Sequence, residues 1–402
     1  MDIVNLNILD NTAFKLENGT YDLDKSVEYG GRMAGICYSK EGLPGSLKED
    51  PEKAIKRATS TARNGHQSVF DHTNITLQVK GPKILNMILN NEGQYNTTER
   101  SLRYVEPTSE NTTYIDPVEM ELYKKWYDIF YKEIEKKVLP HFIDLYGEKQ
   151  AKFKCRNYAK ENARYILSVF TETEMVHTIP LAQLNREITY MEKYLKETPY
   201  DNFNARLIPV IKKYIEECKR LNLYYEDLDV NYADRSLRLF KDDLSLYKNE
   251  FGNNYSYSSF MSYACLAEFQ RHRTLNFSME RPDKPSFYIP NLIKDNKELT
   301  EEFLKDMEKV RHHFPQGELV LVHQDGRMDD FIMMMQQREC TAALYEIWNQ
   351  TDEIKKKYME SLEEQNHPLK DKFKQYTRGY RCTFPNFRCT APCKRNREER
   401  IV

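Results

Sequence analysis

The sequence lacks any long apolar run and lacks a strong charge of either sign. Its 402 residues carry 60 lysines and arginines against 62 aspartates and glutamates, a formal net charge of -2 at pH 7. No apolar stretch approaches the roughly 20 residues that span a bilayer. Without a global positive field, nothing draws the whole chain toward nucleic acid. We therefore expect a protein that binds neither membrane nor nucleic acid.

The cysteine content is ordinary for a chain of this length. Most of the eight cysteines are scattered singly, which suits reduced thiols in a cytoplasm-like compartment. The first residues, MDIVN, lack the basic and apolar regions of a secretory signal, so a cytoplasmic location is expected. Neither a GxGxxG pattern nor a P-loop occurs, and so neither a Rossmann nor a Walker nucleotide site is supported.

The chain is long enough for two or three domains or for one duplicated domain. Similar elements recur in a similar order, which indicates a degenerate internal duplication. The alternative is that two helix-rich halves look alike by chance. The predicted division is a first repeat at 1–217, a connector at 218–254, a second repeat at 255–360 and a Cys-containing basic tail at 361–402.

Local patterns predict several elements. Residues 74–79 alternate between apolar and polar, which predicts a strand with one buried face, and 83–89 predict a helix directly after it. Residues 117–146 predict a long amphipathic helix or a helix pair. Residues 174–195 and 329–358 are each predicted as one helix.

Three short segments carry candidate chemistry. They are GHQSVFDH at 65–72, TERSLRY at 98–104 and AEFQRHRT at 267–274. In the third segment, Arg271 and Arg273 flank His272, so two permanent cations enclose a titratable ring. This arrangement predicts an anion site with an acid/base group, although basic triplets also occur on solvated helix faces.

Together the three segments resemble the signature of the flavin-dependent thymidylate synthases, the ThyX family. The first half keeps the element that precedes the signature and its Glu-x-Ser-x-Arg-Tyr end, but Asn-Glu-Gly at 91–93 stands where Arg-His-Arg is expected. The second half keeps Arg-His-Arg at 271–273 and has lost that end. Two later elements divide similarly: Ala163-Arg164 lies in the first half, and Arg338, followed by Glu346-Ile347, lies in the second.

The resemblance implies an α+β fold made of two tandem copies of a twisted antiparallel sheet flanked by long helices. Family members are homotetramers with nucleotide sites between subunits. Because each half here keeps what the other has lost, we expect one composite site shared by the repeats. A chain of this kind is expected to form a homodimer that mimics the tetramer.

The resemblance also implies the reaction. Methylenetetrahydrofolate donates a carbon to C5 of dUMP, reduced FAD supplies the hydride that completes dTMP, and NADPH reduces the flavin. Arg338 and Arg164 would stabilise negative charge on the uracil. The matching substrate-binding positions are Arg271, Glu99, Ser101, Arg103 and Glu268. The matching FAD-binding positions are His66, Ser68, His272 and Arg273.

Structural roles are the alternative for these residues. His66 could cap a helix, and Ser101 and Arg103 could belong to a surface turn. Arg338 could pair with Glu346, and Arg164 could pair on the surface with Glu161 or Glu172.

Two departures from the family pattern leave the substrate open. Glu268 stands where the family usually has Gln, and Asn276 replaces a Ser. The chain could therefore act on another pyrimidine nucleotide, or add hydroxymethyl in place of methyl. A third possibility is an inactive homologue that only binds a nucleotide.

The tail contains Cys382, Cys389 and Cys393 within a short basic stretch. Three thiolates with His367 or a distant cysteine could hold a structural zinc ion. The spacing is not that of a usual Cys-x-x-Cys knuckle, so plain thiols are the alternative.

Overall fold

The computed structural model describes residues 3–93, 95–102, 104–107, 116–228, 235–240, 243–389, 393, 400 and 402. The chain forms two compact units, each built from two stretches of sequence. Unit 1 comprises Met1–Arg100 and Glu172–Arg238, and unit 2 comprises Ser101–Thr171 and Leu239–Val402. Residues 101–171, expected within the first repeat, therefore belong to the same compact unit as the second repeat. The repeat boundaries themselves stay a prediction.

Unit 1 contains a four-stranded antiparallel sheet with the strand order β1-β2-β4-β3. Its strands are β1 (Asn5–Ile8), β2 (Asn74–Pro82), β3 (Asn96–Glu99) and β4 (Glu172–Pro180). The strand predicted from alternation at 74–79 is confirmed as part of β2. Ile75, Leu77 and Val79 of this strand are fully buried, which places the buried face where the pattern indicated.

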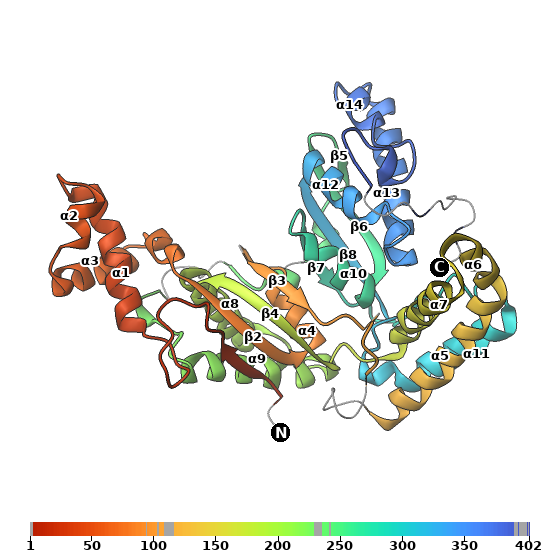
Figure 1. Ribbon diagram of the computed structural model, residues 1–402, viewed down its shortest axis with the longest axis horizontal. Coiled ribbons are helices and arrows are strands. Elements are labelled where there is room, and N and C mark those ends of the chain that lie inside the picture. The colour runs from red at the N-terminus through yellow and green to blue at the C-terminus, as the bar shows by residue number, and fades with distance from the viewer. Residues whose placement is uncertain are drawn as a thin grey trace. The chain divides into compact units, whose positions relative to one another are not determined.

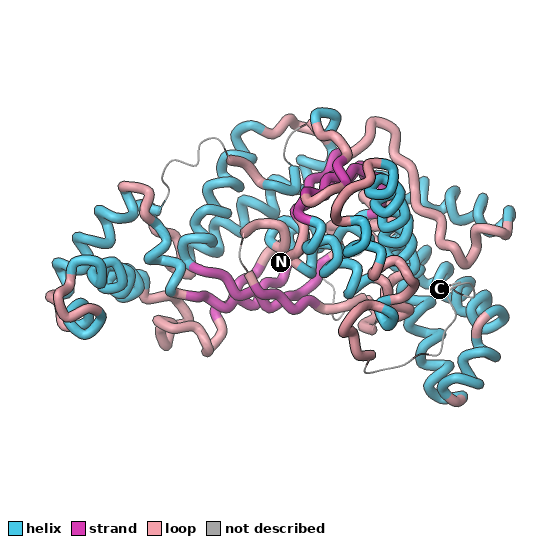
Figure 2. The backbone as a smooth tube through the Cα atoms, turned by 90° about the horizontal axis from the view of Figure 1, so that it is seen from above, coloured by secondary structure: helices cyan, strands magenta, loops and turns pink. Residues whose placement is uncertain are grey.

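Unit 2 contains a second four-stranded antiparallel sheet with the order β5-β6-β8-β7. Its strands are β5 (Glu250–Phe251), β6 (Asn254–Ser262), β7 (Asn276–Glu280) and β8 (Leu319–Arg327). Figure 2 shows the strands gathered into separate groups among the helices.

The central strands of the two sheets and the helix that follows them correspond residue by residue. β2 pairs with β4 from Asn74 opposite Pro180 onward, and β6 pairs with β8 from Asn254 opposite Arg327 onward. A seven-residue helix follows β2 and β6 directly, α4 (Lys83–Leu89) and α10 (Tyr263–Phe269). β3 and β7 then begin at Asn96 and Asn276 without insertion or deletion between the copies. The predicted fold class, two tandem copies of an antiparallel sheet flanked by helices, is confirmed.

A symmetric backbone contact within unit 2 supports the duplication. The segment before β4 and the segment before β8 form an antiparallel bridge between Ser168 and Pro315, which stand at the same distance before their strands. Val169 N–H donates to the carbonyl of Phe314 at 2.9 Å, and Gln316 N–H donates to the carbonyl of Leu167 at 2.7 Å. Each copy therefore gives and receives an equivalent hydrogen bond.

In unit 1, α8 and α9 lie along one face of the sheet, whereas α1, α2 and α3 form a group beyond its end (Figure 1). The helices besides α4 are α1 (Leu23–Gly35), α2 (Leu43–Leu47), α3 (Pro51–Arg63), α8 (Leu181–Glu197) and α9 (Asn202–Arg220). Short 3-10 turns are η1 (Ile36–Tyr38), η2 (Gln67–His72), η4 (Glu226–Leu228) and η5 (Arg238–Phe240), the last of which crosses into unit 2.

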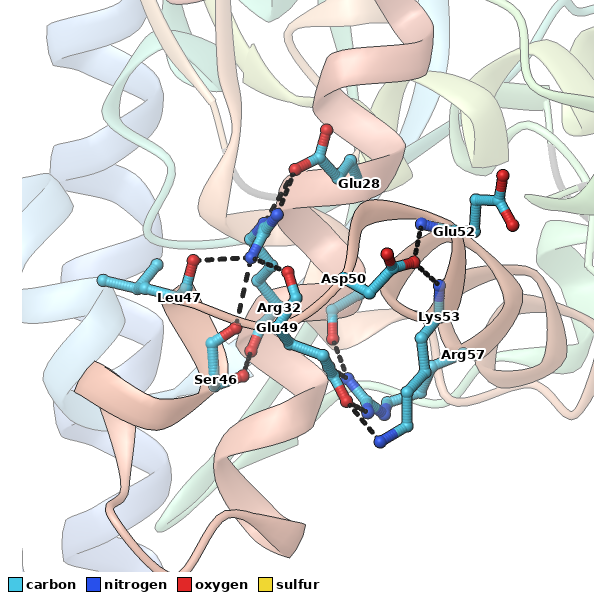
Figure 3. A network of polar contacts seen from close by, with 10 residues as sticks. Glu28, Arg32, Ser46, Leu47, Glu49, Asp50, Glu52, Lys53 and Arg57 are labelled. Carbon is cyan, nitrogen blue, oxygen red and sulfur yellow. Dashed lines mark hydrogen bonds and ion pairs between the residues drawn. The ribbon is translucent and has the colours of Figure 1, made fainter.

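Arginines hold the α1–α3 group together (Figure 3). Arg32 on α1 donates to the carbonyls of Leu47 at 2.5 Å and Glu49 at 2.8 Å, which fixes the segment after α2. Arg57 on α3 binds both carboxylate oxygens of Glu49 at 2.5 and 2.6 Å and also donates to the carbonyl of Gly31 at 2.9 Å. These paired bonds have the fork geometry that guanidinium prefers.

Unit 2 has a group of helices that precedes its sheet in sequence and a group that follows β8. The helices besides α10 are α5 (Pro117–Lys137), α6 (Leu139–Tyr146), α7 (Glu148–Ala163), α11 (Lys297–Val310), α12 (Met328–Arg338), α13 (Tyr345–Glu364) and α14 (Lys370–Lys374). The 3-10 turns are η3 (Arg164–Ile166), η6 (Leu244–Leu246), η7 (Gln270–His272), η8 (Arg311–His313) and η9 (Arg381–Thr383). Trp126 of α5 packs edge-on against Phe303 of α11 with ring centroids 4.8 Å apart.

Two helix predictions were wrong, and one open choice is resolved. Residues 174–195 form the end of β4 followed by α8, because Met175, His177 and Ile179 alternate into the core before Pro180. Residues 329–358 form two helices, α12 and α13, joined by residues 339–344. Residues 117–146 are a helix pair, in which α6 begins at Leu139 after a break at Val138, with Pro140 in its first turn.

Candidate functional site

The candidate site in unit 2 is built around α10. The Ser262 side chain caps this helix by accepting a hydrogen bond from the Cys265 N–H at 3.0 Å. All seven residues of α10 are buried, so the polar Glu268 is carried into the core by an otherwise apolar helix. Arg271 follows within η7, directly after α10.

Glu268 joins two arginines that are far from it in sequence. Arg164 Nη2 donates to Glu268 Oε1 at 2.6 Å, and Arg338 Nη1 lies 3.5 Å from Glu268 Oε2. Arg338 also donates to the main-chain carbonyl of Glu268. All three residues are less than one-tenth exposed. Three predicted site residues are thus brought together inside one compact unit.

The electrostatics of this cluster keep its arginines charged. Burial alone lowers the pKa of Arg164, but the nearby carboxylates of Glu268 and Glu161 outweigh burial and raise that pKa. Arg164 is therefore not the surface residue that the alternative interpretation required. Its Nε is buried and has no hydrogen-bond partner among the described residues. The two guanidiniums thus lie close to the carboxylates of Glu268 and Glu161 in a dry environment, where charge interactions are strong.

A further carboxylate, Glu346, lies near the cluster. It accepts hydrogen bonds from the Ser262 N–H at 2.9 Å, from Ser262 Oγ at 2.6 Å and from the Tyr165 hydroxyl at 2.9 Å. Burial raises the pKa of Glu346, while these hydrogen bonds and the charge of Arg164 oppose the rise. Ser262 and Tyr165 were not predicted as site residues. Tyr165 had one available signal, its position next to Arg164.

The Arg-His-Arg turn adopts an unusual backbone conformation. Arg273 ends η7 with φ +54°, in the left-handed region that non-glycine residues seldom occupy. The equivalent residue of unit 1, Gly93, has φ +60° and reaches this region without steric penalty. Arg273 is exposed and Arg271 is partly exposed. The backbone of His272 lies in η7, and its side chain is outside the described part of the structure.

Unit 1 has an apolar counterpart of this site. Ile88 stands on α4 where Glu268 stands on α10, and Met191 stands on α8 where Arg338 stands on α12. Both residues are fully buried. The counterpart of Arg164 is Arg311, at the same step after its helix, but Arg311 is exposed and lies 3.3 Å from Glu308. The cluster, which takes Arg164 from the first predicted repeat and Glu268 and Arg338 from the second, is therefore not repeated at the corresponding described positions.

Glu92 occupies the unit 1 position that corresponds to His272. Its carboxylate accepts a hydrogen bond from the backbone N–H of Arg238 at 2.5 Å. Burial raises the pKa of Glu92 to about 7, although the Arg238 N–H lowers it. Burial also raises the pKa of neighbouring Glu187 well above its ordinary value, and the charge of Glu92 adds to this rise. This copy has therefore replaced a cationic turn by buried acids.

The remaining predicted residues lie apart from the cluster. His66 and Ser68 are exposed around η2, and Glu99, at the end of β3, forms an ion pair with Lys83 of α4. All four belong to unit 1, whereas Ser101 begins unit 2. Arg103 lies outside the described residues. The composite site shared by the repeats stays a prediction, because each unit supplies only part of the residue set.

The predicted zinc site gains no support. Cys382 and Cys389 are exposed thiols, and Cys393 is partly buried. Within the described part of the chain, no group of three or more His, Cys, Asp or Glu side chains could hold a metal ion. Parts of the tail, residues 390–392 and 394–399, lie outside that description. The same described residues include no helix long and apolar enough to cross a membrane.

Unit 2 thus contains two buried arginines and an exposed arginine turn, and guanidinium groups are well suited to anionic ligands. A family profile described as "Thymidylate synthase complementing protein" (Thy1) matches residues 20–191. This part of the chain is similar to that family, which confirms the resemblance predicted from the motifs for these residues. Members of the family are generally FAD-dependent, and the match supports an enzyme that modifies C5 of a pyrimidine nucleotide.

Other comparisons add little. No curated protein matches the chain. Among solved structures, the UMP/dUMP methylase PolB from Streptomyces cacaoi matches in its complexes with 5-Br dUMP and with 5-Br UMP. Both matches have 14% sequence identity and a TM-score of 0.30, cover 57% of this chain, and cover 94% and 95% of the respective methylase chains. A TM-score this low supports no argument about fold or function.

Proposed function

We propose that this protein is a flavin-dependent enzyme that transfers a one-carbon unit to C5 of a pyrimidine deoxynucleotide, with dUMP as the substrate and dTMP as the product. The observation that carries the proposal is the buried cluster of Arg164, Glu268 and Arg338, with Arg271 three residues after Glu268, in a chain whose residues 20–191 match the Thy1 family. Methylenetetrahydrofolate is the proposed carbon donor, and NADPH is the proposed reductant of the flavin.

The chemistry of the cluster suits charge stabilisation. A uracil can attack through C5 only when it has enolate character, with negative charge on its ring oxygens, and buried guanidiniums stabilise such charge without reorganising solvent. Arg164 and Arg338 would supply this positive charge, and Glu268 would fix their orientation. Arg271 and Arg103 would bind the phosphate, for which planar guanidinium forks are well suited, together with Ser101 and Glu99.

Donors for FAD are available at the predicted positions. The isoalloxazine and pyrophosphate of FAD need hydrogen-bond donors at an accessible surface, and exposed His66, Ser68 and Arg273 are of the required type, with His272 between the two arginines. When bound in its reduced form, FAD would supply the hydride. The protein residues would orient the rings and exclude water. We propose one such site per chain and a homodimer as the assembly, since unit 1 has Ile88 and Met191 at the cluster positions.

Glu268 favours a second candidate. A carboxylate only accepts hydrogen bonds, whereas an amide also donates them. Glu in place of Gln therefore changes which groups of the nucleotide base the site can bind. The reaction could then use another pyrimidine nucleotide, or deliver hydroxymethyl, which mass spectrometry would reveal as a product heavier than dTMP by one oxygen atom. An inactive nucleotide-binding homologue would be isolated without flavin and would convert no nucleotide.

The first test is an absorbance spectrum of the purified protein during a dUMP titration, followed by product analysis with methylenetetrahydrofolate and NADPH. One flavin per chain and formation of dTMP support the proposal. Two flavins per chain would contradict the single composite site, and colourless inactive protein would contradict the enzyme.

The duplication provides a matched pair of variants. Arg164→Ala removes a buried arginine of the cluster, whereas Arg311→Ala removes its exposed counterpart in the other copy. We expect at least about a 100-fold loss of kcat for Arg164→Ala, the loss typical for a removed transition-state donor. Arg311→Ala should stay close to wild type. Equal activity of the two variants would contradict the assignment.

A further inference from the structure

The segment between α12 and α13 joins two groups of the candidate site. It begins after Arg338, which holds Glu268, and it ends before Glu346, which holds Ser262 at the start of α10. Residues 339–344 form no helix or strand, so their position depends on side chains that bind them. Movement of this segment would shift Arg338 and Glu346 relative to one another.

Arg400 binds this segment from a distant part of the chain. Its Nη1 donates to the carbonyl of Cys340 at 3.1 Å, and its Nη2 donates to the carbonyl of Ala343. Its Nε donates to the carbonyl of Val402 at 3.0 Å. The planar fork thus joins two carbonyls of the segment in a way that a lysine ammonium cannot reproduce.

Two aromatic rings cover the Arg400 guanidinium. Its Cζ lies 4.8 Å from the centroid of the Trp348 ring and 5.6 Å from that of Tyr345. Arg400 and Val402 are only 7% and 4% exposed, so this contact is a buried one and not a surface association. Cation–π pairs that are desolvated in this way are among the stronger examples.

The charge of Arg400 also reaches the interior of the site. Burial raises the pKa of Tyr288 well above its ordinary value, with a contribution from Glu346, while the charge of Arg400 opposes the rise. Tyr288 packs against Tyr165, whose hydroxyl donates to Glu346, with ring centroids 4.9 Å apart. Arg400 is therefore connected to the cluster through Tyr288, Tyr165 and Glu346 as well as through the backbone.

A second arginine, Arg381, binds the end of α12 and the first residue of the segment 339–344. The backbone N–H of Arg381 donates to the carbonyl of Glu339 at 2.7 Å, and its Nη1 donates to the carbonyl of Gln336 at 3.0 Å. Gln336 belongs to the last turn of α12, whose carbonyls have no partner within the helix and attract cations. Arg381 thus fixes the end of α12, and Arg400 fixes the segment that follows.

We propose that Arg400 is a positioning residue of the site. It holds the segment 339–344 in place and thereby fixes the positions of Arg338 and Glu346 relative to α10. The proposal rests on the proposed function for its kinetic test. In this role Arg400 touches neither substrate nor flavin. Loss of Arg400 should therefore reduce the rate of turnover more than the affinity for nucleotide.

The experiment compares wild type with Arg400→Ala, Arg400→Lys and Arg32→Ala in the full chain. Arg400→Ala should lower kcat for dUMP by about tenfold or more, since small misplacements of catalytic groups have effects of this order. Its KM should change much less. Arg400→Lys should recover little, and added guanidinium ion should restore part of the rate of Arg400→Ala. Arg32, which also binds carbonyls but in unit 1, is the control for a general loss of stability.

Trp348 gives a readout that needs no turnover. The chain has two tryptophans, so subtracting the emission of matching Trp348→Phe proteins isolates Trp348. Arg400→Ala should shift this emission to the red and make it easier to quench with acrylamide, whereas Arg32→Ala should not. An active wild type with unchanged kcat and unchanged Trp348 emission in Arg400→Ala overturns this inference alone. A wild type without any turnover overturns the proposed function, and this inference with it. If Arg400→Ala fails to fold, Arg400→Lys provides the same comparison.

Discussion

Glu268 Oε1 accepts a hydrogen bond from Arg164 Nη2 at 2.6 Å, although the two residues belong to different predicted repeats. Arg338 binds the same residue through its main-chain carbonyl and lies 3.5 Å from its other carboxylate oxygen. The three side chains are buried together in unit 2. An acceptor between two cations fixes both guanidiniums, so the cluster has a defined geometry before any ligand arrives.

The first prediction concerns Glu268. Glu268→Ala leaves two buried guanidiniums without their carboxylate, and we expect the free energy of unfolding to fall by about 3–5 kcal/mol. Glu268→Gln keeps an acceptor and the side-chain shape, so its loss should be smaller. Urea denaturation measures both. Glu302→Ala is the control, because Glu302 pairs with Lys125 at a half-exposed site and should contribute less than about 1 kcal/mol. Similar losses for Glu268→Ala and Glu302→Ala would refute the energetic role of the cluster.

The second prediction concerns Arg271. If its guanidinium binds the substrate phosphate, Arg271→Ala should raise the Kd of dUMP by about tenfold or more, the effect of losing a charged hydrogen bond. Deoxyuridine, which lacks the phosphate, should bind wild type and variant equally. Isothermal titration calorimetry with both ligands provides the comparison. Equal weakening of both ligands would assign Arg271 to another part of the site.

The third prediction concerns pH. Burial raises the pKa of Glu92 to about 7 from an ordinary value of 4.5. The folded protein therefore holds this proton more tightly than the unfolded chain does, and the contribution of Glu92 to stability falls as pH rises from 4.5 to 7. Glu92→Gln removes this penalty, and so it should stabilise the protein at pH 8 by up to about 3 kcal/mol and have little effect near pH 4.

Chemical denaturation at several pH values measures the effect of Glu92→Gln. Glu148→Gln, at the exposed start of α7, is the control and should bring no comparable gain. A Glu92→Gln protein whose stability tracks wild type across this range would show that Glu92 is ionised at no energetic penalty.

The fourth prediction concerns a buried ion pair beside the segment 339–344. Lys355 Nζ lies 2.5 Å from Glu339 Oε1, and their side chains are 2% and 0% exposed. Lys355→Met should destabilise the protein by about 3–5 kcal/mol, because Glu339 and also Asp352, whose Oδ1 lies 2.8 Å from Lys355 Nζ, lose their buried cation. The double variant Lys355→Met/Glu339→Gln should recover much of this loss. Additive losses in the double variant would argue that the two charges do not interact.

The fifth prediction concerns Gly31 of α1. Helix propensity alone favours alanine over glycine by about 1 kcal/mol, so Gly31→Ala would be expected to stabilise a free helix. However, a Cβ at this position would lie 1.9 Å from the backbone oxygen of Ala54 in α3. The variant should therefore be destabilised and should separate α1 from α3. The sign of the change in melting temperature shows which of the two effects is larger. A Gly31→Ala protein with a raised melting temperature would contradict the close packing of α1 against α3.

The sequence determined the elements whose signals are local. Alternation predicted β2, and the apolar pattern after Pro82 predicted α4 at its observed bounds. It also indicated the family resemblance, because the motifs at 65–72 and 98–104 fall within the residues matched by Thy1. Such signals need only the periodicity of nearby side chains, and for motifs only their identity and order.

Only the tertiary structure decided the rest. β4 was predicted as a helix, because its short alternation is recognised only when β2 and β3 supply hydrogen bonds on either side. The long predicted helix at 329–358 was broken by residues 339–344, whose carbonyls bind Arg381 and Arg400 from much later in the chain. The contact of Arg164 and Arg338 with Glu268 could likewise not be predicted from the spacing of these residues in the sequence. Ion pairs between distant segments depend on how the chain folds back on itself, and no local periodicity records that.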